Sequence, residues 1–175
     1  QYYNEFYMKE IFVLRHAKSS WDNVNLSDHD RPLADRGIKD AAKLCVFVKN
    51  KGYMLDKVLC STAKRAKETF DLTADGFNFE IDKTTYTDKL YFGDATDLIK
   101  HLRELDESLN NILIVGHNPT LHHLVELLAN EQIDRFTTCN LAIIAHAGKR
   151  IALNSHKCSL KSLILSLINI SEPTR

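Results

Sequence analysis

Two histidines stand immediately beyond short apolar runs in this chain. His16 follows residues 11–14 with only Arg15 between them, and His117 follows residues 112–115 with one glycine between them. Continuous apolar runs of this length are typical of strands that are buried on both faces of a parallel sheet. Ligands of such sheets bind beyond the carboxyl ends of the strands, so we expect both imidazoles at one ligand site.

Two arginines accompany the histidines. Arg15 precedes His16, and Arg65 stands just beyond a third strand candidate, residues 58–60. A phosphoryl group in transfer spreads negative charge over three oxygens, and guanidinium groups can hold these oxygens with paired hydrogen bonds. A neutral imidazole can attack phosphorus, while a second, protonated imidazole can bind an oxygen. Together these residue types indicate phosphoryl transfer.

Helical patterns alternate with the strand candidates along the chain. The further helix and strand candidates are residues 38–49, 98–105, 120–129, 141–145 and 160–170. We expect Ser61 or Thr62 to cap the helix that follows, and Pro119 to occupy the first helical position of a later one, so that both helix N-termini offer N–H donors to an anion. The alternation predicts an α/β three-layer sandwich, with a mostly parallel central sheet and helices on both faces.

Three motifs of the chain match a known family in order. Residues 14–17 read Leu-Arg-His-Ala, residues 61–69 read Ser-Thr-Ala-Lys-Arg-Ala-Lys-Glu-Thr, and residues 116–119 read Gly-His-Asn-Pro. They resemble the R-H-G motif (with alanine in place of glycine), the S-x-x-x-R-A-x-x-T signature and the second histidine motif of the histidine phosphatase superfamily, also called phosphoglycerate mutase-like. Residues 15–21, with Asp-Arg-Pro-Leu at 30–33 and Arg-Gly at 36–37, are similar to the small SixA-type phosphohistidine phosphatases.

The resemblance implies a phosphoglycerate mutase-like fold and a role for each matching residue. It makes His16 the nucleophile that becomes phosphohistidine, and it assigns Arg15, Arg65 and His117 to the pocket that binds the phosphate. Arg31 belongs to the Arg-Pro-Leu motif of the first loop, and two interpretations of it stay open. It borders the substrate pocket, or it forms a purely structural salt bridge.

One position departs from the family pattern. Mutase-like members carry a glutamate general acid a few residues before a glycine, whereas this chain has Lys89 before Gly93. An alkoxide leaving group needs an acid, but the imidazole of a phosphohistidine leaves as a neutral group once its other nitrogen is protonated. The departure favours a phosphohistidine substrate, with Asp88 or Asp94 remaining as candidate acids.

The leading hypothesis is an enzyme that hydrolyses phosphohistidine, most simply on a protein, through a covalent phosphohistidine on His16. We expect no metal and no other cofactor, because the arginines and a protonated His117 would supply the positive charge that Mg²⁺ gives in many phosphotransfer sites. One alternative is a phosphomonoesterase that acts on a small phosphorylated metabolite. Another is a phosphate-binding module without catalysis.

Composition limits the partners and the location. Among 175 residues, Lys plus Arg and Asp plus Glu both total 23, and this zero net charge argues against a nucleic-acid partner. No apolar run is long enough to span a bilayer, so we expect a soluble, cytoplasmic protein whose four cysteines are free thiols. Residues 8–170 are expected to form a single domain, and residues 1–7 to be a tag remnant or an N-terminal extension.

Several other residues could in principle bind a metal or a ligand, but we interpret them as structural. His122 and His123 are adjacent, so a helix would point them about 100° apart, and we expect no metal site there. Trp21 is predicted to be a packing residue. Tyr91 and Phe92 are predicted to pack in the core or a loop, with the mouth of the substrate pocket as the alternative.

Overall fold

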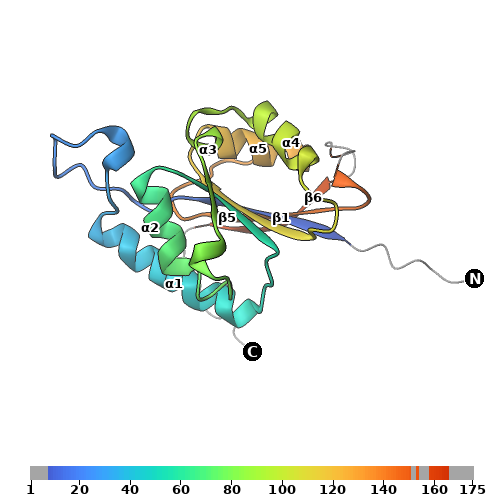
Figure 1. The fold of residues 1–175 in the computed structure, drawn as a ribbon, viewed down its shortest axis with the longest axis horizontal. Helices are drawn as coiled ribbons and strands as arrows, with labels where there is room; N and C mark the ends of the chain where they lie inside the picture. Colours follow the sequence, from blue (N-terminus) through green and yellow to red (C-terminus); the bar gives the residue numbers. More distant parts are fainter. Residues whose placement is uncertain (1–7, 151–152, 154–157, 166–175) are drawn as a thin grey trace, which may run out of the picture.

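A six-stranded mixed sheet forms the centre of the protein (Figure 1). The structure, a computed structural model, describes residues 8–150, 153 and 158–165. The strand order across the sheet is β3-β2-β4-β1-β5-β6. The strands are β1 (Lys9–Arg15), β2 (Lys57–Ser61), β3 (Thr85–Thr87), β4 (Asn111–Gly116), β5 (Leu141–His146) and β6 (Cys158–Ile164).

The four strands at one side of the sheet are parallel. β4 pairs in parallel with both β1 and β2, and β2 pairs in parallel with β3. β5 and β6 complete the sheet as an antiparallel pair beside β1. The prediction of a mostly parallel sheet is therefore confirmed.

Helices cover both faces of the sheet and make three layers, as predicted (Figure 1). The helices are α1 (Asp35–Lys51), α2 (Lys64–Thr73), α3 (Lys89–Phe92), α4 (Ala95–Glu104) and α5 (Thr120–Ala129). α1 and α2 lie on one face, and α3, α4 and α5 lie on the other. No helix in the described part of the chain has the length and apolar character that a membrane span requires.

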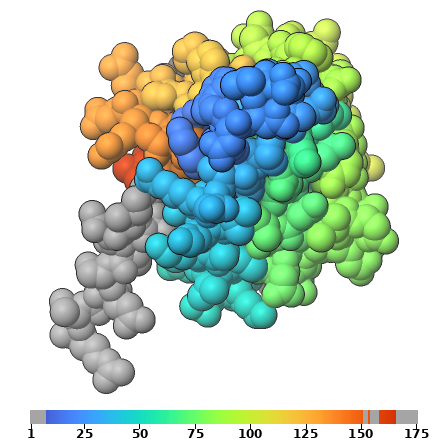
Figure 2. Space-filling view, turned by 90° about the vertical axis from the view of Figure 1, so that its left-hand side faces the viewer, coloured from blue at the N-terminus to red at the C-terminus, as the bar shows by residue number. Residues whose placement is uncertain are grey.

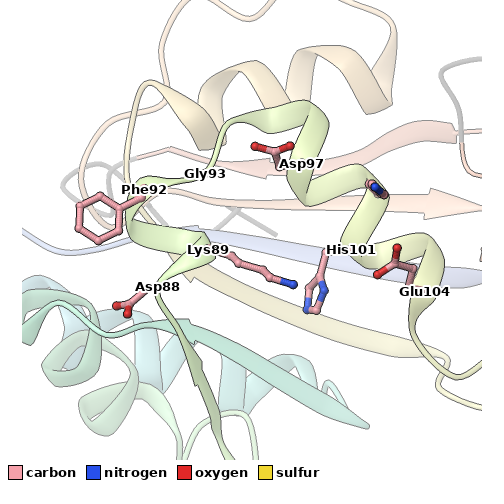
Figure 3. A pocket seen from close by; sticks show the side chains of 8 residues that line it. Asp88, Lys89, Phe92, Gly93, Asp97, His101 and Glu104 are labelled. Atoms are coloured by element: carbon pink, nitrogen blue, oxygen red, sulfur yellow. The ribbon is translucent and has the colours of Figure 1, made fainter.

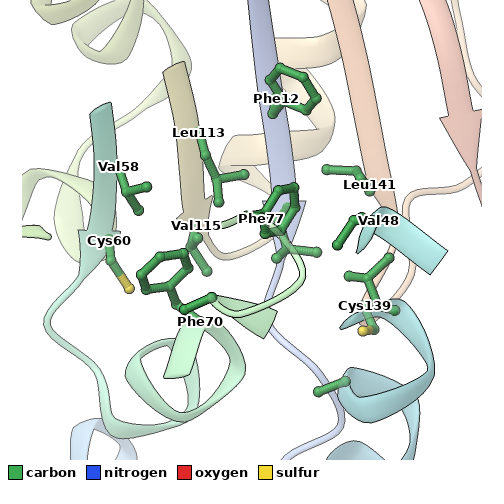
Figure 4. Packing of buried hydrophobic residues seen from close by; sticks show 14 of the residues in the cluster. Phe12, Val48, Val58, Cys60, Phe70, Phe77, Leu113, Val115, Cys139 and Leu141 are labelled. Carbon is green, nitrogen blue, oxygen red and sulfur yellow. The ribbon is translucent and has the colours of Figure 1, made fainter. Parts of the chain in front are cut away.

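Each face of the central strands contributes side chains to a separate apolar cluster. Phe12 and Leu14 of β1 pack with α1 and α2, next to Phe70 and Phe77 (Figure 4). The alternate residues of the same strand face α4 and α5. All four residues of the apolar run in β1 are fully buried, which explains why the run lacks the polar alternation of a one-sided strand.

Some predicted boundaries shift. The strand predicted over 160–170 is β6, which begins at Cys158 and ends at Ile164, and residues 166–170 lie outside the described residues. The capping prediction for Ser61 or Thr62 is wrong, because β2 continues through Ser61 and the cap position of α2 is Ala63 without a side-chain bond. Pro119 is the cap residue of α5, one position before the predicted one.

A long loop, residues 16–34, joins β1 to α1 and lies over the carboxyl edge of the parallel strands. Figure 2 looks onto this edge and shows the loop in blue beside green segments from the middle of the chain. The loop is held against α1 by the Ala34 N–H, which donates to the Lys18 carbonyl at 2.9 Å. A Cβ at Gly37 of α1 would overlap this same Lys18 oxygen, so the close approach requires glycine.

Candidate active site

The register of the parallel sheet brings the two motif histidines together. Arg15 of β1 pairs with Gly116 of β4, so His16 and His117 both stand one residue beyond the paired ends. The His16 N–H donates to the Gly116 carbonyl at 3.0 Å, which extends the ladder by one step. The two ring centroids are 5.0 Å apart, and both residues are buried.

One nitrogen of His16 is committed to the main chain. Its Nδ1 lies 2.7 Å from the Ala17 carbonyl oxygen. Because a carbonyl oxygen only accepts, Nδ1 carries the proton and Nε2 keeps its lone pair. Burial, together with the charges of Arg65, Arg15 and Arg31, lowers the pKa of His16 to about 4, against the opposing effect of the Ala17 bond. The imidazole is therefore neutral, with Nε2 as its free nucleophilic atom.

Thr69 of α2 ties the His16 loop to the helix that carries Arg65. Its hydroxyl accepts the Ala17 N–H at 2.9 Å and donates to the Arg65 carbonyl at 2.7 Å. Thr69 and Ala17 are both fully buried, so neither bond competes with water. The last threonine of the motif at 61–69 thus fixes the distance between two motifs that are far apart in the sequence.

His117 also has one engaged ring nitrogen. Its Nε2 lies 2.7 Å from the Ser61 Oγ at the end of β2, and its buried Nδ1 has no hydrogen-bond partner among the described residues. Burial lowers the pKa of His117 to about 3, with the charges of His16 and Arg65 adding to this effect. Asp28 acts in the opposite direction and raises it. Before an anion binds, His117 is therefore neutral at physiological pH.

The two motif arginines reach the histidines from different elements. Arg15 ends β1, and its Nη1 donates to the Phe136 carbonyl at 3.2 Å. Arg65 stands in the first turn of α2 and is buried. Both of its terminal nitrogens donate to Asp28, Nη1 to the main-chain oxygen at 2.6 Å and Nη2 to the carboxylate at 3.0 Å. We call Arg15, His16, Arg65 and His117 the phosphoryl site.

Two further residues lie beside the phosphoryl site, Asp28, which was not predicted, and Tyr91, for which the pocket mouth was only the alternative. The carboxylate of Asp28 accepts from Arg65 and from the Tyr91 hydroxyl, the latter at 2.6 Å. The ring of Tyr91 lies edge-on to His117, with centroids 5.4 Å apart. Tyr91 packs against the rings of His29 and Phe92, in line with the packing prediction, and its hydroxyl bond to Asp28 also brings it beside the phosphoryl site. Asp28 had no sequence signal beyond its place three residues before Arg31.

The family of the chain follows from a match along most of its length. The family model described as histidine phosphatase superfamily (branch 1) matches residues 11–174. The chain belongs to the histidine phosphatase superfamily. This membership confirms the family resemblance and supports a phosphatase that hydrolyses a phosphorylated substrate.

Individual relatives narrow the comparison within the superfamily. An uncharacterized protein of Mycobacterium leprae is 34% identical over 148 residues, which cover 78% of this chain and 89% of that protein. Phosphohistidine phosphatase SixA of Escherichia coli is 26% identical over 137 residues, 77% of this chain and 84% of SixA. A solved structure of the protein histidine phosphatase SixA complexed with tungstate matches with a TM-score of 0.75 at 23% identity, over 89% of this chain and 96% of that chain. The likeness confirms the phosphoglycerate mutase-like fold.

In this histidine phosphatase, Arg31 both forms a salt bridge and contributes charge to the site. Its Nη1 donates to the Asp28 carboxylate at 2.8 Å, and its Nη2 donates to the Ser19 hydroxyl. Trp21 covers the guanidinium, with the Arg31 Cζ 3.3 Å from the ring centroid. Trp21 therefore packs on Arg31, as predicted, although 68% of it stays exposed. Arg31 is near enough to lower the pKa of His16.

The candidate general acids have partners outside the phosphoryl site. Asp94 caps α4 by accepting the Asp97 N–H at 2.9 Å, and Asp88 accepts from the Thr62 hydroxyl. In the described part of the chain neither carboxylate bonds to His16 or His117. Lys89, at the place of the family glutamate, extends toward His101 in a separate cleft between α3 and α4 (Figure 3). This cleft is lined by Asp88, Lys89, Phe92, Gly93, Asp97, Lys100, His101 and Glu104.

Proposed function

We propose that this protein hydrolyses phosphohistidine on a protein substrate, through a covalent phosphohistidine formed on His16. The observation that carries the proposal is the bond from His16 Nδ1 to the Ala17 oxygen at 2.7 Å, which leaves Nε2 as the nucleophile. His117 stands beside His16, and the charges of three arginines lower the pKa of His16. The arginines that hold the phosphoryl oxygens are Arg15 and Arg65, with Arg31 at their border.

The first step transfers the phosphoryl group to His16. The Nε2 lone pair forms a bond to phosphorus while the phosphorus–nitrogen bond of the substrate breaks, and that electron pair returns to the substrate nitrogen. With its other ring nitrogen protonated, the substrate imidazole leaves as a neutral group. Arg15 and Arg65 stabilise the charge on the equatorial oxygens.

The second step returns the enzyme to its starting state. Water attacks phosphorus, the electron pair of the phosphorus–Nε2 bond returns to His16, and the proton lost by water leaves with phosphate or solvent. His16 then again holds one proton, on Nδ1. The bound phosphoryl group favours the cation at His117, so this imidazole gains a proton on binding and its Nδ1 can donate to a phosphoryl oxygen.

The protonation state of the nearby carboxylate favours one class of leaving group. The pKa of Asp28 is held well below its usual range by the Tyr91 hydroxyl, with Arg65 and Arg31 adding to this effect against burial. Asp28 is therefore ionised and cannot donate a proton to an alkoxide. Because phosphohistidine needs no such donor, it suits the site better than a phosphomonoester.

A divalent metal is not required in this proposal. Arg15, Arg65 and a protonated His117 supply the positive charge around the phosphoryl oxygens. Activity should therefore persist in EDTA. Complete loss of turnover in EDTA, with recovery on addition of Mg²⁺, would overturn this part of the proposal.

A substrate panel tests the proposed function. The protein is incubated with a phosphohistidine-bearing protein, phosphoserine, phosphotyrosine and a small sugar phosphate, and the release of phosphate is compared with that of the His16→Ala variant. We expect turnover of the phosphohistidine protein well above that of every ester. Faster turnover of the esters would favour a phosphomonoesterase, and phosphate binding without turnover of any substrate would favour a binding module.

A further inference from the structure

Asp28 joins three segments of the chain at one carboxylate. Its Oδ1 accepts from Arg31 at 2.8 Å, and its Oδ2 accepts from Arg65 at 3.0 Å and from the Tyr91 hydroxyl at 2.6 Å. Its main-chain oxygen adds the second bond to Arg65, at 2.6 Å. The Asp28 side chain is 51% exposed, whereas that of Arg65 is 8% exposed. An exposed carboxylate thus holds a buried guanidinium by one edge.

We propose that Asp28 is a positioning residue of the phosphoryl site, which orients Arg65 toward the phosphoryl oxygens and offsets the positive charge around His117. This inference rests on the proposed function of the same site. The geometry explains the first part, because Asp28 binds one N–H on each terminal nitrogen of Arg65. A guanidinium group has five N–H donors, so three remain for a phosphoryl group.

The second part follows from the charges around the site. Arg15, Arg31 and Arg65 all act on His16, and a proton on His117 adds a fourth positive charge. Like charges at these distances oppose one another strongly in a buried site. Asp28 supplies a negative charge that makes protonation of His117 less costly when a phosphoryl group binds.

Polar and charged groups from several elements surround His117. The groups that face it are Arg15 and His16 at the end of β1, Ser61 at the end of β2, Arg65 of α2, Tyr91 of α3 and Asp28 of the β1–α1 loop. Of the charged groups that act on its pKa, Asp28 raises it, whereas His16, Arg65 and Arg15 lower it. Removal of the Asp28 charge should therefore make His117 harder to protonate.

Kinetics of Asp28→Asn test the positioning role. Asparagine keeps the size of the side chain but offers one oxygen, so we expect kcat to fall at least about tenfold, since small misplacement of a catalytic group is costly. Asp28→Glu, which keeps the charge, should recover part of this loss. Asp30→Asn is the matched control, because Asp30 lies on the same turn and bonds to Ser27 at 2.9 Å. It should behave like the wild type.

A double-mutant cycle shows whether Asp28 acts through Arg65. With each kcat taken at the maximum of its pH profile, Asp28→Asn should change the Arg65→Ala enzyme less than about twofold, because the group it orients is gone. Equal effects in both backgrounds would contradict the positioning role. Wild-type kcat in both Asp28→Asn and Asp28→Ala would also overturn it.

A titration without turnover separates this inference from the proposed function. In the protein saturated with inorganic phosphate, histidine-labelled NMR with a His117→Gln reference spectrum gives the protonation midpoint of His117. We expect Asp28→Asn to move this midpoint to lower pH and Asp30→Asn to leave it unchanged. An unmoved midpoint in Asp28→Asn overturns the charge role even if the enzyme is active. A shifted midpoint in a protein that hydrolyses nothing supports the role and counts only against the proposed function.

Discussion

The residues of the phosphoryl site and its surroundings come from two regions that are positioned in different ways. The strand-end set, Arg15, His16, Arg65 and His117, stands at or just after the carboxyl ends of β1, β2 and β4. The loop set, Asp28, Arg31 and Tyr91, lies in the β1–α1 loop and in the four-residue helix α3. In the first set, Arg15, His16 and His117 are placed by the pairing of β1 with β4, and Arg65 is placed by the first turn of α2. The second set is held by hydrogen bonds among its own side chains and to Arg65.

This difference indicates that the two sets contribute to the reaction to different extents. Arg15, His16 and His117 are anchored at the ends of buried strands, where a shift of one residue would disrupt the packing on both faces, and Arg65 is buried in α2. The loop set is partly exposed and depends on one carboxylate. We therefore expect substitutions in the strand-end set to abolish the reaction or slow it strongly. Substitutions in the loop set should lower kcat to a smaller extent.

Arg65→Ala should have the largest effect among the charged residues of the site. It removes donors to the transition-state oxygens, and the loss of one such group costs on the order of 10²–10³ in rate. Steady-state kcat on a phosphohistidine protein measures the effect. Arg36→Ala, at an exposed arginine of α1, is the control and should keep wild-type rates. A similar loss in both variants would show a general electrostatic effect in place of a local one.

Tyr91→Phe should have a smaller effect. The change removes the hydroxyl that donates to Asp28 at 2.6 Å but keeps the ring against His117. We expect kcat to fall about tenfold or less, with a loss of unfolding free energy of about 1 kcal/mol, the usual contribution of one hydrogen bond. Tyr86→Phe on β3 provides the matched control. An effect as large as that of Arg65→Ala would mean that the two sets do not differ as described.

The acid limb of the rate profile should show the smallest change over the accessible range. His16 must be neutral to attack, and its pKa is lowered to about 4, so the rate is lost only as pH falls through this lowered value. Between pH 7.5 and 5.5 we expect no loss of kcat/KM after correction for titration of the substrate, because His16 stays neutral and the proton that His117 gains on binding favours lower pH. A nucleophilic histidine with a pKa of about 6.5 would instead lose roughly tenfold of its neutral form over this range. An acid limb near pH 6.5 would show that burial does not perturb His16.

The two sets also differ in how well the sequence predicts them. The apolar runs before His16 and His117 indicate buried strands, and the carboxyl ends of parallel strands are the ligand-binding edge. Asp28 is one of several acidic residues in a polar loop, and no periodicity shows which of them meets Arg65, which lies 37 positions away. The packing of Tyr91 was predicted, but its hydroxyl bond to Asp28 was not, because an aromatic residue before Phe92 and a glycine indicates packing and names no polar partner.

The sequence also predicts the helices and strands of the fold better than the residues at which they begin and end. Hydrophobic spacing predicted α1, α4 and α5, and the alternation of strands and helices predicted the layered architecture. It did not predict the cap of α2, because Ser61 remains in β2 and its hydroxyl lies 2.7 Å from His117 Nε2. Because Ser61 contacts a residue of the site, it does not serve as the helix cap that a serine at this position suggests.

The most direct test of the account is capture of the covalent intermediate. The protein is mixed briefly with a phosphohistidine protein, quenched in alkali to preserve phosphoramidates, and digested for mass spectrometry. We expect a phosphoryl group on His16, absent from the His16→Ala variant, which should also lose turnover while it retains its fold by circular dichroism. A phosphoryl group on another residue, or undiminished turnover by His16→Ala, would contradict the central claim that His16 is the nucleophile.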